Sequence, residues 1–184
     1  MPSQNYTTEN LHWQAFTHGN REAFGVLYQI YFKKLYNYGN KFSRDNKLVE
    51  DAIQDLFIKL WTNRANLNEP VSVKNYLFKA LRSNIFRKLV QNAKFTADDD
   101  LAKNYDFDIS LSAEMLLIAS ESEQIQTKNL QNSLENLTQR QKEAIFLRFN
   151  ENLGYDEIAT LMDISVKATY KLVYRALEVL REGV

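Results

Sequence analysis

Residues 157–177 read EIATLMDISVKATYKLVYRAL, two stretches with helical spacing that are interrupted at residues 163–165. The apolar residues on either side of the break fall on faces that can meet, and the small Ala159 lets the two helices approach closely. Ser165 is suited to start the second helix because its hydroxyl can accept a hydrogen bond from a backbone N–H of the first turn. Such a pair of helices is typical of a helix-turn-helix unit, whose second helix is aimed outward to enter the major groove of duplex DNA.

The second helix of this unit has a basic and aromatic outer surface. Lys167 and Lys171 lie one turn apart and, with Arg175, can reach phosphates or base edges, and tyrosine hydroxyls can do either. The residues that we expect to contact the duplex are Ser165, Val166, Lys167, Tyr170, Lys171, Tyr174 and Arg175. Because any tight helical hairpin can show the same pattern, this motif alone does not decide the function.

The helix before this unit carries an N-terminal capping signal. Thr138 and Gln141 have the spacing of a capping box, so the pattern predicts a helix from about Gln139 to about Asn150. The sequence NENLG then turns the chain, and a short helix is expected over residues 155–162.

The N-terminal half begins with a long amphipathic helix. From Asn20 onward, aromatic and leucine side chains recur at spacings of four and three, which places them on one stripe of a helix. The residues of the stripe are Phe24, Tyr28, Tyr31, Leu35, Tyr38 and Phe42. Asn20 is expected to cap the helix, and the stripe is interpreted as part of the core.

The next helix, expected over residues 48–63, has two distinct faces. Its apolar residues supply a buried face, whereas Asp51, Gln54 and Asp55 lie together on the opposite face. Three interpretations of this acidic face are open: a solvated surface, an acid/base pair, or a docking surface for a basic partner. The acid/base pair is disfavoured because no His, Ser or metal ligand accompanies the carboxylates.

A third helix, expected over residues 73–91, interleaves basic with aromatic side chains. Lys and Arg can neutralise phosphates and aromatic rings can stack on exposed bases, so the pattern indicates contact with single-stranded DNA. The candidate DNA-binding residues are Lys74, Tyr76, Lys79, Arg82, Arg87 and Lys88. The competing interpretation is a solvated basic helix whose aromatic residues belong to the core.

Charge divides the chain into three parts, although its net charge is zero. Residues 1–94 carry 14 Lys/Arg and 7 Asp/Glu, a net of +7, whereas residues 95–124 carry one Lys and 8 acids, a net of −7. The remaining residues are balanced. We therefore expect an all-α protein with two helical domains, residues 1–92 and 124–184, joined by an acidic linker, residues 93–123, with a short helix near residues 112–119.

The composition also disfavours several classes of function. The chain of 184 residues has no cysteine, which fits a reducing compartment, and we expect it in the cytoplasm. We expect neither a signal peptide nor a membrane span. His12 and His18 have no acidic or cysteine partners at ligand spacing, and no glycine-rich phosphate loop is present, so neither an enzyme nor a cofactor is expected.

Taken in order, these features resemble the small two-domain, extracytoplasmic-function (ECF) type of the sigma-70 family of bacterial sigma factors. NREAFGVLYQIYFKKLYNYG is similar to region 2.1, EDAIQDLFIKLW to region 2.2, and VKNYLFKALRSNIFRKL to regions 2.3 and 2.4. The stretch from LENLTQRQ to EVLRE, residues 134–182, is similar to region 4. The resemblance implies a region 2 helical bundle and a region 4 helix-turn-helix domain.

The resemblance also implies what the charged faces do. Asp51, Gln54 and Asp55 would dock on the clamp helices of the polymerase β′ subunit. The third helix would hold DNA around the −10 element, and the loop TNRANLNE would receive a flipped base during promoter opening. Region 4 would bind the −35 element as a duplex and touch the β flap. An anti-sigma factor, often membrane-bound, is a further implied partner, whereas a small-molecule substrate is not.

The chain departs from the family pattern at positions that bear on DNA contacts. Tyr76 stands where a Trp often opens region 2.3, Gly154 replaces a capping Ser, and Asp163 replaces a Gly at the turn of the final motif. Two alternatives to a sigma factor stay open. One is a helix-turn-helix regulator that acts alone on duplex operators, although it would need no docking face or strand-opening helix in the N-terminal half. The other is a sigma-like adaptor that does not initiate transcription, which the departures leave open.

Overall fold

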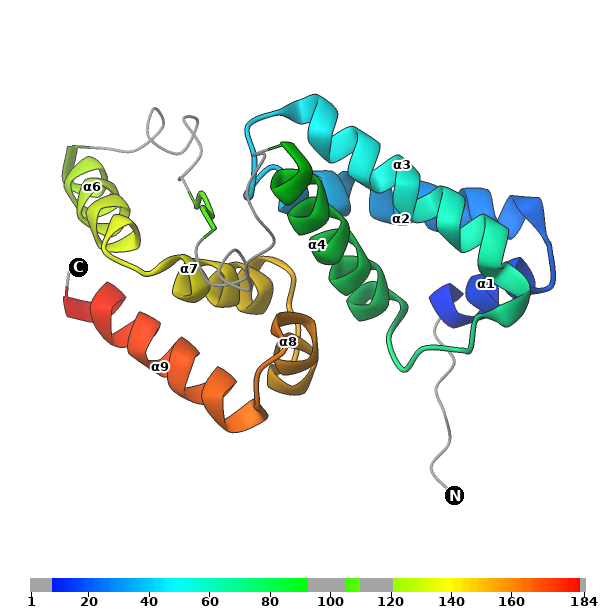
Figure 1. Ribbon diagram of the computed structural model, residues 1–184. Coiled ribbons are helices and arrows are strands. Elements are labelled where there is room, and N and C mark those ends of the chain that lie inside the picture. Colours follow the sequence, from blue (N-terminus) through cyan, green and yellow to red (C-terminus); the bar gives the residue numbers. More distant parts are fainter. Residues whose placement is uncertain (1–7, 93–104, 110–120, 183–184) are drawn as a thin grey trace, which may run out of the picture. The chain divides into compact units, whose positions relative to one another are not determined.

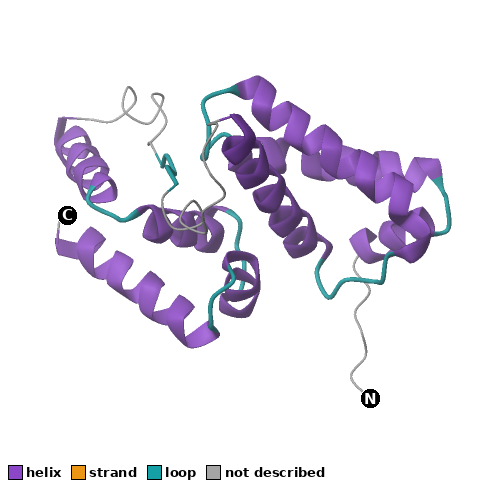
Figure 2. Ribbon diagram, in the orientation of Figure 1, coloured by secondary structure: helices purple, strands orange, loops and turns teal. Residues whose placement is uncertain are grey.

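The computed structural model describes residues 8–92, 105–109 and 121–182, and these residues form helices and loops with no strand (Figures 1 and 2). The predicted all-helical class is confirmed. The chain divides into two compact units, Met1–Asp98 and Asp99–Val184. The short helix expected near residues 112–119 lies outside the described residues, and the exact domain limits stay a prediction.

The helices of each unit are named as in Figure 1. In the first unit they are α1 (Thr8–Thr17), α2 (Arg21–Gly39), α3 (Asn46–Asn63), the 3₁₀ turn η1 (Arg64–Asn66) and α4 (Val73–Asn92). In the second unit they are α6 (Glu121–Glu135), α7 (Gln139–Ile145), the π-helical turn η2 (Phe146–Asn150), α8 (Tyr155–Met162) and α9 (Val166–Glu182).

Helix α2 starts at the predicted cap and packs through the predicted stripe. The Asn20 side chain accepts a hydrogen bond from the Ala23 N–H at 2.9 Å. Tyr31, Leu35 and Tyr38 are fully buried, which places the stripe in the core of the unit. A Cβ on Gly39 would lie 2.5 Å from a Val49 methyl carbon, so glycine is needed where the end of α2 meets α3.

Helix α1 was not predicted from the sequence, yet it supplies two of the most buried rings of the first unit. Trp13 and Phe16 are 1% and 0% exposed and meet edge to face, with ring centroids 5.4 Å apart. Phe16 also stacks on Phe24 of α2. The helix has less than three turns, and a single i, i+3 pair of aromatic residues is too short a pattern to reveal a period.

The second unit contains the predicted capped helix and helix-turn-helix. Thr138 and Gln141 form the capping box: the Thr138 hydroxyl accepts from the Gln141 N–H at 3.3 Å, and Gln141 Oε1 accepts from the Thr138 N–H at 2.9 Å. Asp163 adopts the left-handed conformation (φ 54°, ψ 49°) directly after α8. Ser165 Oγ then accepts from the Ala168 N–H at 3.1 Å and caps α9 as expected.

The cap of α8 keeps half of its usual interactions. Gly154 has no side chain to accept from the first turn, but its own N–H donates to Glu157 Oε2 at 2.9 Å. The replacement of a capping Ser therefore leaves one of the two reciprocal hydrogen bonds in place.

A short piece of the acidic stretch, residues 105–109, packs against α7. The Tyr105 hydroxyl donates to the buried Glu143 carboxylate, and the Phe107 N–H donates to Gln139 Oε1 at 2.8 Å. The Phe107 ring meets Phe146 edge to face at 5.8 Å. The alternation of buried Tyr105 and Phe107 with exposed Asp106 and Asp108 explains how an acidic segment can still contribute to a core.

We expect Phe107→Ala to destabilise the second unit by about 3 kcal/mol, because the ring is 1% exposed and its removal leaves a cavity beside Phe146. Phe149→Ala is the matched control, since Phe149 is 55% exposed in the same unit. Urea unfolding followed by circular dichroism measures both. An equal loss of stability in the two variants would show that residues 105–109 do not contribute to the core.

Candidate functional site

One face of α3 carries the acidic residues predicted from the sequence. Gln54 is exposed, and Asp51 and Asp55 are partly exposed, so all three can reach a partner. Ile58, one turn after Gln54 on the same face, is 63% exposed. The face therefore combines carboxylates with an aliphatic side chain that the sequence interpretation left out.

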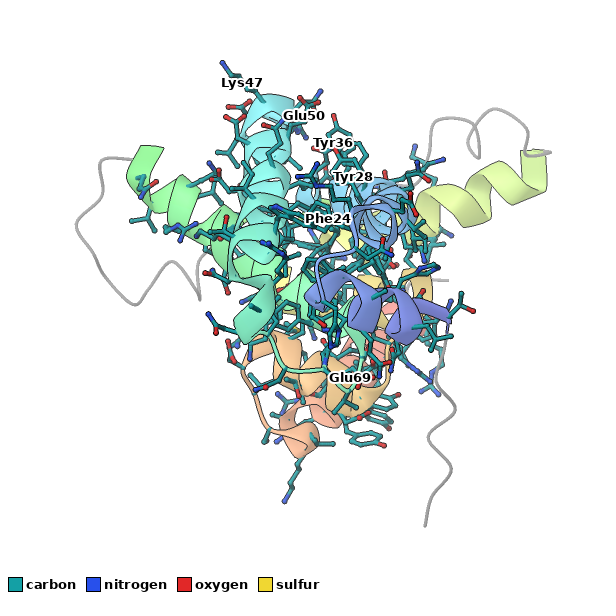
Figure 3. The ribbon with its side chains drawn as sticks, turned by 90° about the vertical axis from the view of Figure 1, so that its right-hand side faces the viewer. Phe24, Tyr28, Tyr36, Lys47, Glu50 and Glu69 are labelled. Atoms are coloured by element: carbon teal, nitrogen blue, oxygen red, sulfur yellow. The ribbon has the colours of Figure 1, made fainter. Side chains whose placement is uncertain are left out.

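Beside this face an open, mainly apolar groove of about 380 Å³ lies between α2 and α3. It is lined by Phe24, Tyr28, Gln54, Phe57, Ile58, Trp61 and Thr62. The rings of Phe24 and Trp61 are 5.1 Å apart, and those of Tyr28 and Phe57 are 4.9 Å apart. Figure 3 shows Phe24 and Tyr28 in succession along α2. The groove can take the apolar side of a partner helix.

The groove was missed in the sequence because two of its residues belong to the stripe that was interpreted as core. Phe24 and Tyr28 are only half-buried, whereas the later residues of the stripe are covered. An available signal was Ile58, an apolar residue on the otherwise polar face of α3. Periodicity identifies which residues share a face, but not whether a neighbour covers all of that face.

The basic residues predicted on α4 do not form one uniform surface. Arg87 and Tyr76 are exposed, and Lys74 and Lys79 are partly exposed. Arg82 is only 7% exposed, and its guanidinium lies 4.5 Å from the centre of the Phe86 ring.

The sixth predicted DNA-binding residue, Lys88, is joined to the acidic face of α3. Its Nζ lies 2.8 Å from Asp55 Oδ2. The structure thus brings together two residues that the sequence assigned to different surfaces. An ion pair with this much exposure contributes at most about 1 kcal/mol, so it does not prevent either residue from exchanging its partner.

Tyr76 lies beside a second, smaller pocket of about 200 Å³. The lining residues are Leu56, Lys59, Leu60, Asn63, Leu67, Tyr76, Ala80 and Asn84. Asn63 and Leu67 come from the loop TNRANLNE. The Tyr76 hydroxyl is protonated at neutral pH, as in any tyrosine, and can donate a hydrogen bond; partial burial raises its pKa further.

Helix α1 fixes this loop and the Tyr76 ring. Trp13 Nε1 donates to the Asn68 carbonyl at 3.3 Å, and Gln14 Nε2 donates to Glu69 Oε2 at 2.9 Å. The Trp13 ring also meets Tyr76 edge to face, with centroids 5.2 Å apart. Residues of α3 and α4 therefore line the pocket, and α1 fixes the loop and the Tyr76 ring that border it.

In the second unit, all seven residues predicted to contact duplex DNA are exposed on or next to α9. Val166, Tyr170 and Tyr174 are 44%, 53% and 64% exposed. The opposite side of α9 is anchored by buried Thr169, Val173 and Ala176. A hydrogen bond to Glu178 on the same helix raises the pKa of Tyr174.

The described part of the chain lacks two other kinds of site. It holds no group of three or more His, Asp or Glu residues placed to bind a metal ion. None of its helices has the length and apolar character needed to span a membrane.

Comparison with protein families finds one matching family for each unit. Residues 27–95 match the family Sigma-70 region 2, and residues 127–180 match the family Sigma-70, region 4. The ECF RNA polymerase sigma-E factor of Haemophilus influenzae is 25% identical over 174 residues, covering 90% of this chain and 89% of that protein. The ECF RNA polymerase sigma factor SigM of Bacillus subtilis is 26% identical over 153 residues, with coverage of 82% and 88%.

Solved structures show the same fold. CnrH, determined in complex with the cytosolic domain of CnrY, is 18% identical with a TM-score of 0.62 and 95% coverage of both chains. The sigma factor RpoE of Bartonella quintana, determined with the anti-sigma factor NepR, is also 18% identical, with a TM-score of 0.60 and coverage of 88% of this chain and 96% of that one.

We expect Trp13→Phe to loosen the loop around Asn68 while largely preserving the aromatic packing, because the indole N–H is lost and most of the ring area is kept. Amide hydrogen exchange in residues 67–69 should accelerate about tenfold, the equivalent of one hydrogen bond. Leu11→Ala, at a 55% exposed position of the same helix, is the control. Unchanged exchange in Trp13→Phe would mean that α1 does not fix the loop.

Proposed function

This chain belongs to the sigma-70 family of RNA polymerase sigma factors, and we propose a mechanism by which its residues bind core polymerase and promoter DNA. It directs core RNA polymerase to promoters and is not an enzyme. The observation that carries the mechanism is that one chain combines a docking face with an apolar groove in one unit and an exposed recognition helix in the other. The proposed functional division is residues 1–92, 93–123 and 124–184, and the proposed place of action is the cytoplasm.

The docking surface for core polymerase is the α3 face with the adjoining groove. Asp51, Gln54 and Asp55 supply hydrogen-bond acceptors for a basic partner helix, and Ile58 with the groove supplies apolar area. An apolar centre with a charged rim is the composition of a specific protein interface. The proposed partner is the pair of clamp helices of the β′ subunit.

The −10 element is proposed to bind along α4 and the loop after α3. Lys74, Lys79 and Arg87 lie where they can neutralise phosphates, and the pocket beside Tyr76 is large enough for one flipped base. Taking a base out of the stack costs a few kcal/mol, and a preformed wall with an aromatic ring offsets part of that cost.

The −35 element is proposed to bind as a duplex to the exposed side of α9. Lys167, Lys171 and Arg175 are exposed there and can contact phosphates. The second unit is also the proposed contact for the β flap. An anti-sigma factor is a further proposed partner, because the Bartonella quintana relative of the same fold was determined with one.

Transcription in a purified system tests the proposed function. The full chain is added to core RNA polymerase and fragmented genomic DNA of its host, and the 5′ ends of the transcripts are mapped. We expect new starts that share two upstream boxes and depend on the protein. Tight binding to core polymerase without new starts would favour an adaptor, and DNA binding without any core binding would favour a regulator that acts alone.

The docking surface is tested separately with Ile58→Lys. We expect it to weaken binding to core polymerase at least about tenfold, because a charge would enter the apolar centre of the interface, while the exposed position leaves the fold intact. Leu11→Lys makes the same change at an exposed leucine on α1. Binding is measured by fluorescence titration with core polymerase. Equal affinities for the two variants would remove the α3 groove from the interface.

A further inference from the structure

The recognition helix α9 has an exposed apolar and aromatic stripe beside its basic one. Val166, Tyr170, Tyr174 and Leu177 recur at spacings of four, four and three and are 41% to 64% exposed. Lys167, Lys171 and Arg175 follow one position later and form a parallel basic row. The two rows therefore lie next to each other along the same exposed side of the helix.

The ring of Tyr170 is held in place by a residue that the sequence interpretation did not select. Tyr155, at the start of α8, stacks on Tyr170 with ring centroids 3.9 Å apart and planes 20° apart. The guanidinium of Arg148 lies 4.9 Å from the centre of the Tyr155 ring, and its Nη1 donates to the Leu153 carbonyl at 3.0 Å. Tyr170 is thus fixed on one side and 53% exposed, so little rotamer freedom is lost when it binds a ligand.

The polar groups around the stripe limit how bases can be read. Helix α9 contains no Asn or Gln, the side chains that pair with adenine through two hydrogen bonds. The hydroxyl oxygen of Ser165 accepts the hydrogen bond that caps α9. Along the stripe itself, Val166 and the ring of Tyr170 present exposed carbon surface. The carbon group that duplex DNA offers in its major groove is the C5 methyl of thymine.

We propose that Tyr170, positioned by Tyr155, reads thymine methyl groups in the upstream promoter box, with Val166 extending the same apolar contact. This inference rests on the proposed function, since it needs α9 to lie in the major groove. The basic row then contacts the phosphates beside the groove and supplies affinity that does not depend on sequence. Tyr155 is a positioning residue that acts through Tyr170.

The test uses holoenzyme reconstituted from the full chain and core polymerase, with a promoter found by mapping transcript starts. Each dT of the upstream box is replaced in turn by deoxyuridine, which pairs like thymine but lacks the methyl group. For the unchanged protein, we expect an affinity loss of about fourfold at one or two positions, the value of one buried methyl. In Tyr170→Ala holoenzyme the same replacement should have no effect.

Further variants separate the thymine contact of Tyr170 from the loss of phosphate contacts and from misfolding. Tyr155→Ala should reduce the penalty for deoxyuridine, and Tyr155→Phe, which keeps the stacked ring, should restore it. Lys171→Ala is the matched control, because it should weaken binding and flatten its salt dependence while the penalty for deoxyuridine stays unchanged. Circular dichroism confirms that each variant is folded.

Three results would overturn the proposal. The first is tolerance of deoxyuridine at every position of the box by the unchanged protein, with promoter binding otherwise intact. The second is a penalty that persists in Tyr170→Ala. The third is a loss of affinity for core polymerase in Tyr170→Ala without DNA, which would make the stripe a protein-binding surface. If no start depends on the protein at all, the proposed function fails and this inference fails with it.

Discussion

The left-handed backbone at Asp163 is the constraint on which the binding surface of the second unit depends. It ends α8, and the following Ile164 N–H donates to the Ala159 carbonyl at 3.0 Å, so the chain reverses within two residues. A left-handed conformation is uncommon outside glycine, but Asp is among the residues that tolerate it. Because Ser165 starts α9 at once, the direction of α9 follows from this turn and from the packing of α8 against α9, where Ile158 and Val173 are buried.

Local signals in the sequence predicted the helices well, because caps and periodicity act within a few residues. The predicted helix caps all make the expected hydrogen bonds: Asn20, the pair Thr138 and Gln141, and Ser165. Helices α1 and α6 and the packed segment at residues 105–109 escaped prediction. Trp13 and Phe107 are buried by partners far along the chain, and a pattern in a short segment carries no information about such partners.

The candidate sites could be located from charge, but their detailed composition could not. The sequence placed Asp55 on one functional surface and Lys88 on another, yet the two side chains form an ion pair. Likewise Arg82 has the charge of a phosphate ligand, but it is buried against Phe86. Which charged side chains face outward on a helix depends on how the neighbouring helix crosses it, and that crossing is set by core packing rather than by charge.

Aromatic side chains at the surface of each unit lie beside charged residues, which are acidic in the first unit and basic in the second. In the first unit, the Phe24 and Tyr28 rings line a groove whose adjoining residues Asp51 and Asp55 are acidic. In the second unit, Tyr170 and Tyr174 lie beside basic residues. In both proposed interfaces, apolar area supplies binding free energy, and the charge beside it selects the proposed partner: a basic protein surface in one case and a polyanion in the other. The zero net charge of the whole chain is the sum of a basic N-terminal part, an acidic stretch and a balanced C-terminal part, so it says nothing against DNA binding by one surface.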